Sequence, residues 1–472
     1  MTKLVDDRPG WPMFGGEAGA DAGRAARNRV PRETHGDWRP KKGRRDPVDL
    51  LESQAALRLP DLLPIRYGRM LSSPLAFYRG AALVMANDLA GSPATGLTVQ
   101  ACGDAHLSNF GLFGTPERAI VFDINDFDET LPGPWEWDLK RLTASFAIAG
   151  RYVGFDVKQR NEIVTACARS YRLAMRQFAA MKAIDVWYAR LDSTVMQQWR
   201  SQVTNSQVKK VQRIVAKARS RDSTRALSKL ATSEGGNHRF LSQPPLLVPL
   251  SELFGADDRS RVLAWSEELL GEYAESLRPE MRHLLGNYRV VDMARKVVGV
   301  GSVGTRGFIY LLQGRDAADT LILQAKEATA SVLEEFAGAS RFPRHGERVV
   351  VGQRSMQAAS DMLLGWIRTT GLDGVERDFY LRQLWDWKGS ADVEGALPSG
   401  MQVYGEMCGW TLARAHARTG DAVAISAYLG SGDVFDRAMS RFAESYADQN
   451  EMDHQSLAEA VREGRIEART GL

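Results

Sequence analysis

A glycine-rich turn between two β-rich segments constrains the fold of this chain more than any other stretch. The turn contains Gly299, Gly301 and Gly304, follows a valine-rich segment and precedes the apolar residues 308–312. In a dinucleotide-binding unit a helix begins at the third glycine, and an acidic residue follows about twenty positions later. Here the chain continues with β-branched and aromatic residues. The sequence therefore predicts an antiparallel β-hairpin and not a strand-to-helix turn.

A lysine lies in a third apolar segment, residues 320–328. Glycines allow backbone N–H groups to approach phosphate oxygens, and a nearby ammonium group neutralises them. We therefore expect a nucleotide site formed by Gly299, Gly301, Ser302, Gly304 and Lys326. A helix with an acid that pairs with Lys326 is expected next. Glu347 opens a suitable amphipathic segment, and Glu334 and Glu335 are nearer alternatives.

Two acidic turns lie far upstream of this hairpin. The apolar residues 96–102 lead into Gly103-Asp104, Asn109 follows, and a second β-rich segment ends in a group of carboxylates that includes Asp126. Phosphoryl transfer from ATP requires an acid that orients or deprotonates the attacking hydroxyl. It also requires an amide and an acid that hold Mg²⁺ against the phosphates. Asp104, Asn109 and Asp126 are these residue types in this order.

These motifs resemble the catalytic and metal loops of small-molecule kinases. Gly103-Asp104-Ala105-His106 with Asn109 resembles the catalytic loop of the aminoglycoside and choline phosphotransferase branch of the protein-kinase-like fold. Asp126-Phe127-Asp128 resembles the kinase Asp-Phe-Gly metal motif. The chain departs from the pattern at Cys102, where those kinases usually carry a histidine that organises the backbone.

The resemblance implies metal ligands but leaves their identity open. Asn109 and Asp126 are the first candidates, with Asp123 and Asp128 beside them. In those kinases a Trp-Asp-Leu element follows the metal aspartate, and the spacing to Asp138 favours Asp126 over Asp123. The spacing from Asn109 favours Asp123 instead, so both remain candidates. Asp138 is expected to brace the catalytic loop.

The chain is also similar, over nearly its whole length, to the bacterial family catalogued as domain of unknown function 2252. The segments that carry this similarity are Leu63-Pro64-Ile65-Arg66, Gly103-Asp104-Ala105-His106, Asn125-Asp126-Phe127-Asp128-Glu129-Thr130, Gly301-Ser302-Val303-Gly304-Thr305-Arg306 and Gly352-Gln353-Arg354. The resemblance groups the family with kinase-like folds and supplies no substrate.

The motif order indicates a permuted arrangement, because the catalytic loop precedes the glycine turn, whereas ordinary kinases have the reverse order. We expect an α+β, two-lobed, protein-kinase-like fold. Its expected parts are a flexible basic arm (1–45), a helical catalytic lobe (46–290), a β-rich nucleotide-binding lobe (291–395) and C-terminal helices that pack on the catalytic lobe (396–472).

Composition excludes several other classes of protein. The 61 basic and 58 acidic residues nearly balance, so there is no global attraction to nucleic acid or membrane. A basic stripe from Lys209 to Lys229 is interpreted as a solvated helix face, because no aromatic residues alternate with the charges. Three dispersed cysteines indicate neither disulfides nor a zinc site. No long apolar segment is present, and a cytoplasmic location is expected.

The leading hypothesis is an ATP- and Mg²⁺-dependent phosphotransferase that acts on a hydroxyl of a small molecule. Asp104 is the expected base, Asn109 and Asp126 the metal ligands, and Lys326 the phosphate anchor. The alternatives are a protein-directed kinase or nucleotidyl transferase, and a nucleotide-binding pseudokinase or scaffold. Three arginines near an apolar helix, Arg66, Arg69 and Arg79, are either phosphate contacts or members of ion pairs, the second role being favoured.

Overall fold

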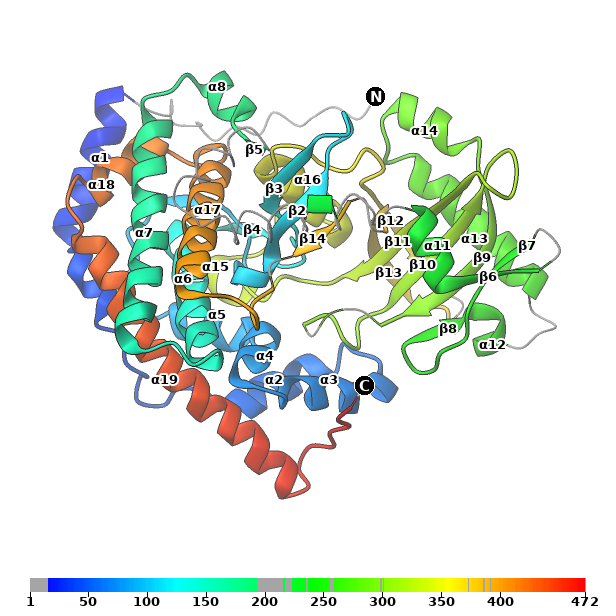
Figure 1. Cartoon of the computed structure of the whole chain (residues 1–472), viewed down its shortest axis with the longest axis horizontal. Coiled ribbons are helices and arrows are strands. Elements are labelled where there is room, and N and C mark those ends of the chain that lie inside the picture. The colour runs from blue at the N-terminus through cyan, green and yellow to red at the C-terminus, as the bar shows by residue number, and fades with distance from the viewer. Residues whose placement is uncertain are drawn as a thin grey trace.

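The computed structural model describes residues 16–192, 215–216, 223–234, 237–254, 259–297, 299, 301–371, 373–384, 387–390 and 392–471. It is a mixed α+β structure with several antiparallel sheets. Figure 1 shows long helices gathered on one side and the largest sheet on the other. Most of the basic stripe, residues 209–214 and 217–222, lies outside the described residues.

A six-stranded antiparallel sheet forms one lobe. Its strands, in spatial order, are β12 (Gly365–Thr370), β13 (Glu376–Gln383), β11 (Thr320–Ala328), β10 (Gly307–Gln313), β9 (Arg289–Lys296) and β8 (Leu247–Pro249). The glycine turn joins β9 to β10. The two strands pair in antiparallel orientation, with Phe308 opposite Arg295. The predicted hairpin is confirmed, and no helix begins at the third glycine.

The alternation of side chains along β11 assigns its residues to opposite faces of the sheet. Leu323 and Ala325 belong to the apolar cluster beneath α13 (Arg259–Ala274), which also contains Tyr273. Gln324 and Lys326 have the opposite orientation and line a cavity between the lobes. The side-chain period of two therefore directs the lysine toward the cavity and its neighbours toward the core.

Short helices and strands surround this sheet. They are α11 (Ser223–Leu230), β6 (Ala231–Glu234), β7 (Asn237–Phe240), α12 (Leu250–Phe254), α14 (Pro279–Leu285), α15 (Glu334–Ala337) and α16 (His345–Met356). Leu230 and Leu250 pack into clusters of sheet residues. The sheet lobe therefore begins well before the boundary expected at residue 290. Strands β7 and β8 both precede this boundary.

The helical lobe is built around α6 (Trp135–Tyr152) and α7 (Val157–Ala179). Against them pack α17 (Pro398–Ala417) and α19 (Val434–Arg462), with α18 (Ala422–Leu429) beside α7. A Cβ at Gly409 of α17 would lie 2.3 Å from the carbonyl oxygen of Cys167. Glycine therefore allows the close approach of these two helices.

The remaining elements connect these parts. They are η1 (Arg32–Gly36), α2 (Pro47–Ala55), η2 (Pro60–Leu62), α3 (Leu63–Met70), α4 (Pro74–Gly80), α5 (Ala82–Leu89), α8 (Ala183–Tyr188), η3 (Leu107–Asn109), the pair β1 (Thr98–Ala101) and β4 (Leu131–Pro134), and a sheet of β14 (Gly389–Ser390), β2 (Phe110–Gly114), β3 (Ile120–Ile124) and β5 (Leu191–Asp192). Helices α4 and α5 meet at Ala81. No helix among the described residues has the length and apolarity that would span a bilayer.

Residues 16–45 are packed on the helical lobe, which corrects the expectation of a flexible arm. Helix α1 (Gly16–Arg29) lies against α18, and Arg27 donates to the carbonyl oxygen of Tyr428 over 3.0 Å. Arg44 donates to Asp88 over 2.6 Å and to Asp453 over 2.6 Å, and both carboxylates are almost fully buried. Arginines that appear in the sequence as a basic tail are thus structural. Residues 1–15 of the expected arm lie outside the described residues.

We predict that Arg44→Met lowers the free energy of unfolding by about 3–5 kcal/mol, because it leaves two buried carboxylates without their counter-charge. Arg45→Met is the matched control, since it removes only an exposed ion pair with Glu335 and should cost less than about 1 kcal/mol. Urea unfolding measures both variants. Equal small effects would mean that this segment is not packed as described.

Candidate active-site cleft

The first acidic turn is held in place by Asp138 on α6. Its carboxylate accepts hydrogen bonds from the backbone N–H of Cys102 over 2.6 Å and of Gly103 over 2.9 Å. Buried His416 contacts the same carboxylate over 3.1 Å. Gly103 has a φ of +82°, and a Cβ there would lie 2.3 Å from the carbonyl oxygen of Glu129. This turn therefore requires glycine, and the bracing role expected for Asp138 is confirmed.

Asp104 leaves this turn with its side chain in the cleft. Arg141, one turn beyond Asp138 on α6, donates to one of its carboxylate oxygens over 2.5 Å. The other oxygen lies 3.8 Å from Nε2 of His106. Burial lowers the pKa of His106 to about 4, so this ring is neutral near pH 7. The amide of Asn109 donates to the backbone carbonyl of Asp104 over 2.7 Å, which places these two residues side by side.

Asp126 and Asp128 extend from the second turn toward the sheet lobe. The ammonium group of Lys326 lies 3.4 Å from Asp126 and 3.0 Å from Asp128. Tyr380 of β13 also donates to Asp128 over 2.5 Å. Although burial opposes it, Lys326 and Arg382 hold the pKa of Asp126 well below its usual range. Burial and the neighbouring Asp126 raise the pKa of Asp128.

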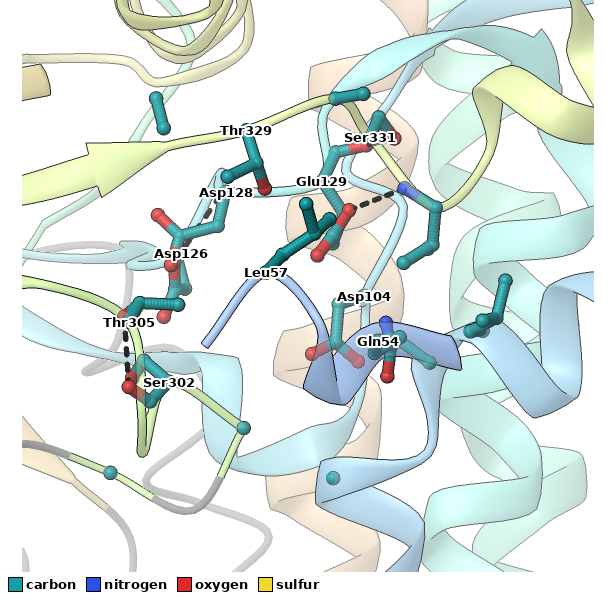
Figure 2. Close-up of a pocket in the computed structure, with 18 of the residues that line it drawn as sticks. Gln54, Leu57, Asp104, Asp126, Asp128, Glu129, Ser302, Thr305, Thr329 and Ser331 are labelled. Carbon is teal, nitrogen blue, oxygen red and sulfur yellow. Dashed lines mark hydrogen bonds between the residues drawn. The ribbon is translucent and has the colours of Figure 1, made fainter. Parts of the chain in front are cut away.

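The two acidic turns and the glycine turn face each other across one cleft. A cavity of about 330 Å³ lies between them. Figure 2 shows Asp104, Asp126, Asp128 and Glu129 along its wall, together with Ser302 of the glycine turn. A second cavity of about 420 Å³ shares part of this wall and is also lined by Lys326. The wall residues common to both cavities are Arg79, Asn109, Asp126, Gly299 and Ser302.

The two cavities differ in charge. The carboxylates around the first are Asp104, Asp126, Asp128, Glu129, Glu327 and Glu335, and its arginines are Arg58 and Arg79. The cations around the second are Arg79, Lys296, Lys326, Arg382 and Lys388, and its carboxylates are Asp126 and Asp361. The cleft therefore has an acidic half and a basic half that meet at Asp126.

The glycines of the turn have different surroundings. Gly299 and Gly301 line the first cavity, and a Cβ at Gly301 would lie 3.1 Å from the carbonyl oxygen of Arg79. Gly304 has a φ of +91°, and its carbonyl accepts the N–H of Leu59 over 2.7 Å. Gly304 thus shapes the turn and anchors it to η2, and it lines neither cavity.

Besides Gly304, two residues predicted from the sequence lie away from the cleft. Asp123 is buried in an ion pair with Arg414 over 2.5 Å, and it accepts the N–H of Ala358 over 2.8 Å. Its carboxylate therefore stabilises the fold beneath the second turn and lines neither cavity. Glu347 on α16 also lines neither cavity, and Lys326 takes its acidic partners from the helical lobe instead. Glu334 caps the N–H of Ser331 over 3.0 Å.

Two site residues were not singled out from the sequence. Arg141 lies three positions after Asp138, and this spacing places both on one side of a helix. This helical spacing is the feature of the sequence that could have identified Arg141 as a site residue. Glu129 follows Asp128 directly and accepts the N–H of Val332 over 2.7 Å. Burial raises its pKa to about 7, which no local pattern indicates, because the residues that bury it come from another part of the chain.

Asp126 and Asn109 have the chemistry to hold Mg²⁺ together with a phosphorylated ligand. Asp126 keeps a third of its side chain exposed in the cleft. Mg²⁺ bound with substrate phosphates needs only one or two protein carboxylates, so a three-residue cage is not required. Among the described residues, no group of three His, Cys, Asp or Glu side chains forms such a cage. Asp128 fits less well, because both of its oxygens already accept hydrogen bonds.

We predict a stability change with pH that depends on Glu129. Between its ordinary pKa of 4.5 and its folded value of about 7, the folded state keeps a proton that the unfolded state has lost. The free energy of unfolding should therefore fall as the pH rises through this window and stay level above it. Glu129→Gln keeps the hydrogen-bond acceptor and removes the ionisable group. The free energy of unfolding of this variant, minus that of the wild type, should therefore be higher at pH 8 than at pH 4.5 by on the order of 2 kcal/mol.

Urea unfolding at both pH values measures this difference. Glu335→Gln, at an exposed position of the same cavity, is the matched control. If the wild type and Glu129→Gln differ in free energy of unfolding by the same amount at both pH values, the raised pKa assigned to Glu129 is wrong.

Comparison with known proteins identifies a family and gives no information on activity. A sequence model described as an uncharacterized protein conserved in bacteria (DUF2252) matches residues 58–460. No curated protein and no solved structure matches the chain.

Proposed function

The chain belongs to the DUF2252 family, and we propose that it is an ATP- and Mg²⁺-dependent phosphotransferase that moves the γ-phosphoryl group to a hydroxyl of a small molecule. The observation that carries this proposal is the contact of Lys326 with Asp126 and Asp128 in the cleft that also contains Asp104. Phosphoryl transfer depends on positioning and charge neutralisation, and these are the groups it uses.

The sheet lobe supports a kinase-like arrangement. The glycine turn joins its first two long strands, β9 and β10, Lys326 lies on the third, β11, and α16 follows before β12 and β13. A glycine-rich loop, a lysine on the third strand and a following helix are the kinase order. The proposed fold is therefore a permuted kinase-like fold with this lobe inserted late in the chain.

One contact differs from the kinase pattern. There the lysine pairs with a glutamate of the following helix. Here α16 instead extends buried Arg348 toward the helical lobe, and Arg348 donates to the carbonyl oxygens of Asp128 over 2.9 Å and Thr130 over 2.6 Å. Helix α16 thus positions the metal loop directly.

The charge of the cleft suggests how the substrates are divided. We assign the nucleotide phosphates to the basic half, where Lys326 and Arg382 lie. Arg79 lines both halves, and its buried Nε has no hydrogen-bond partner, so it is a further phosphate contact in the proposal. The acceptor hydroxyl then occupies the acidic half beside Asp104. Bound Mg²⁺ would neutralise phosphate charge at Asp126 and Asn109.

Asp104 orients the acceptor hydroxyl in this mechanism. Arg141 holds one carboxylate oxygen and so fixes the direction of the other. The main contribution of Asp104 in the proposal is the orientation of the hydroxyl, and proton transfer follows late in the reaction. Lys326 exchanges its carboxylate partners for the nucleotide phosphates when ATP binds.

We predict that Asp104→Ala, Asp126→Ala and Lys326→Met each reduce ATP consumption at least about 100-fold without unfolding the protein. ATP turnover screened against a panel of metabolites and antibiotics supplies the assay. Asp316→Ala, in the exposed turn between β10 and β11, is the matched control and should leave turnover unchanged. Full turnover in any of the three cleft variants would refute its role.

Products distinguish the alternatives. Transfer to a small molecule yields ADP and an unmodified enzyme, whereas a nucleotidyl transferase leaves a nucleotide on a protein. Mass spectrometry of the enzyme after incubation with Mg²⁺ and ATP separates them, and a nucleotide adduct would contradict the lead. A pseudokinase or scaffold would bind ATP without turnover, although a pure binder has no need of Asp104.

A further inference from the structure

A separate apolar cavity lies on the outer face of the six-stranded sheet, opposite the face that carries Lys326. Its volume is about 220 Å³, and its apolar lining includes Leu250, Trp265, Leu269, Met293, Ala325 and Leu381. These residues come from α12, α13 and the strands β9, β11 and β13. None of them lines either half of the cleft.

Part of the lining is charged. It contains Arg295, Arg306 and Arg377, with Asp373 as the single carboxylate. Arg377 is paired with Asp373 over 2.7 Å, and Arg306 with Glu327 over 3.3 Å. The remaining arginine is less completely neutralised, because it pairs over 3.0 Å with Asp61, whose side chain is 53% exposed.

Arg295 also has an unsatisfied donor. Its Nε is buried and has no hydrogen-bond partner. A buried N–H without an acceptor is unfavourable, and a carboxylate at this position would satisfy it with a charge-assisted hydrogen bond. The lining therefore combines an apolar wall with a guanidinium group whose Nε–H lacks an acceptor.

From this combination we propose that the outer cavity binds a single-chain anionic amphiphile, a long-chain carboxylate, with its chain against the apolar wall and its head group at Arg295. The proposal is independent of the phosphotransferase activity. A neutral chain would leave the arginine donor unsatisfied, and a cationic head group would meet three guanidinium groups. Charge complementarity thus selects the carboxylate.

Calorimetric titration of the full chain with saturated carboxylates of eight to sixteen carbons, below their critical micelle concentrations, tests the proposal. Affinity should rise roughly fourfold with each added methylene until the cavity is filled. The corresponding alkylamines and alkanols are the comparison ligands and should bind at least tenfold more weakly. Absence of binding by every carboxylate, or equal binding by the amines, would overturn the proposal.

Variants locate the site. Arg295→Gln should weaken carboxylate binding about tenfold, whereas Arg295→Lys should retain it within about threefold. Thr369→Phe, on the edge strand β12, should fill the cavity and abolish binding. Leu253→Glu, at a position that is 40% exposed, places a repelling charge in the lining with little risk to folding. Binding that neither Thr369→Phe nor Leu253→Glu reduces would show that the ligand lies elsewhere.

Discussion

The contact of Lys326 with Asp126 and Asp128 joins the two lobes, and much of the surrounding structure maintains it. Removing an ammonium group and two carboxylates from water costs several kcal/mol for each ion unless they are paired and further hydrogen-bonded. Tyr380 supplies one such bond to Asp128, and Arg348 holds the backbone of the same loop. The lobes therefore meet at charged groups, and in the proposed function the phosphates of ATP take the place of this pairing.

The helical lobe positions the wall of the cleft that carries Asp104. Asp138 holds the turn before Asp104, and Arg141 from the same helix holds its carboxylate. Helix α6 thus positions both the backbone and the side chain of one loop. Because α6 is itself buried against α7 and α19, the geometry of the cleft depends on the packing of the whole helical lobe. A loop supported in this way is suited to positioning a substrate.

The sequence predicted the features that depend on local patterns. The hairpin followed from glycine positions and β-branched residues, and the place of Lys326 in the third strand followed from the apolar segment that contains it. The structure differs from the sequence-based predictions where long-range packing decides the role of a residue. Asp123 lies in β3, three residues before Asp126, and it is buried in an ion pair with Arg414 from a helix near the end of the chain. Arg44 lies in a polar segment, and its two acidic partners are distant in sequence.

In the proposed function, the basic half of the cleft receives the phosphates of ATP together with Mg²⁺. Isothermal titration calorimetry of the full chain with a non-hydrolysable ATP analogue, with and without Mg²⁺, tests it most directly. We expect one saturable site whose affinity for the analogue increases at least tenfold with Mg²⁺. An absence of binding under both conditions would contradict the phosphotransferase proposal and the pseudokinase alternative together.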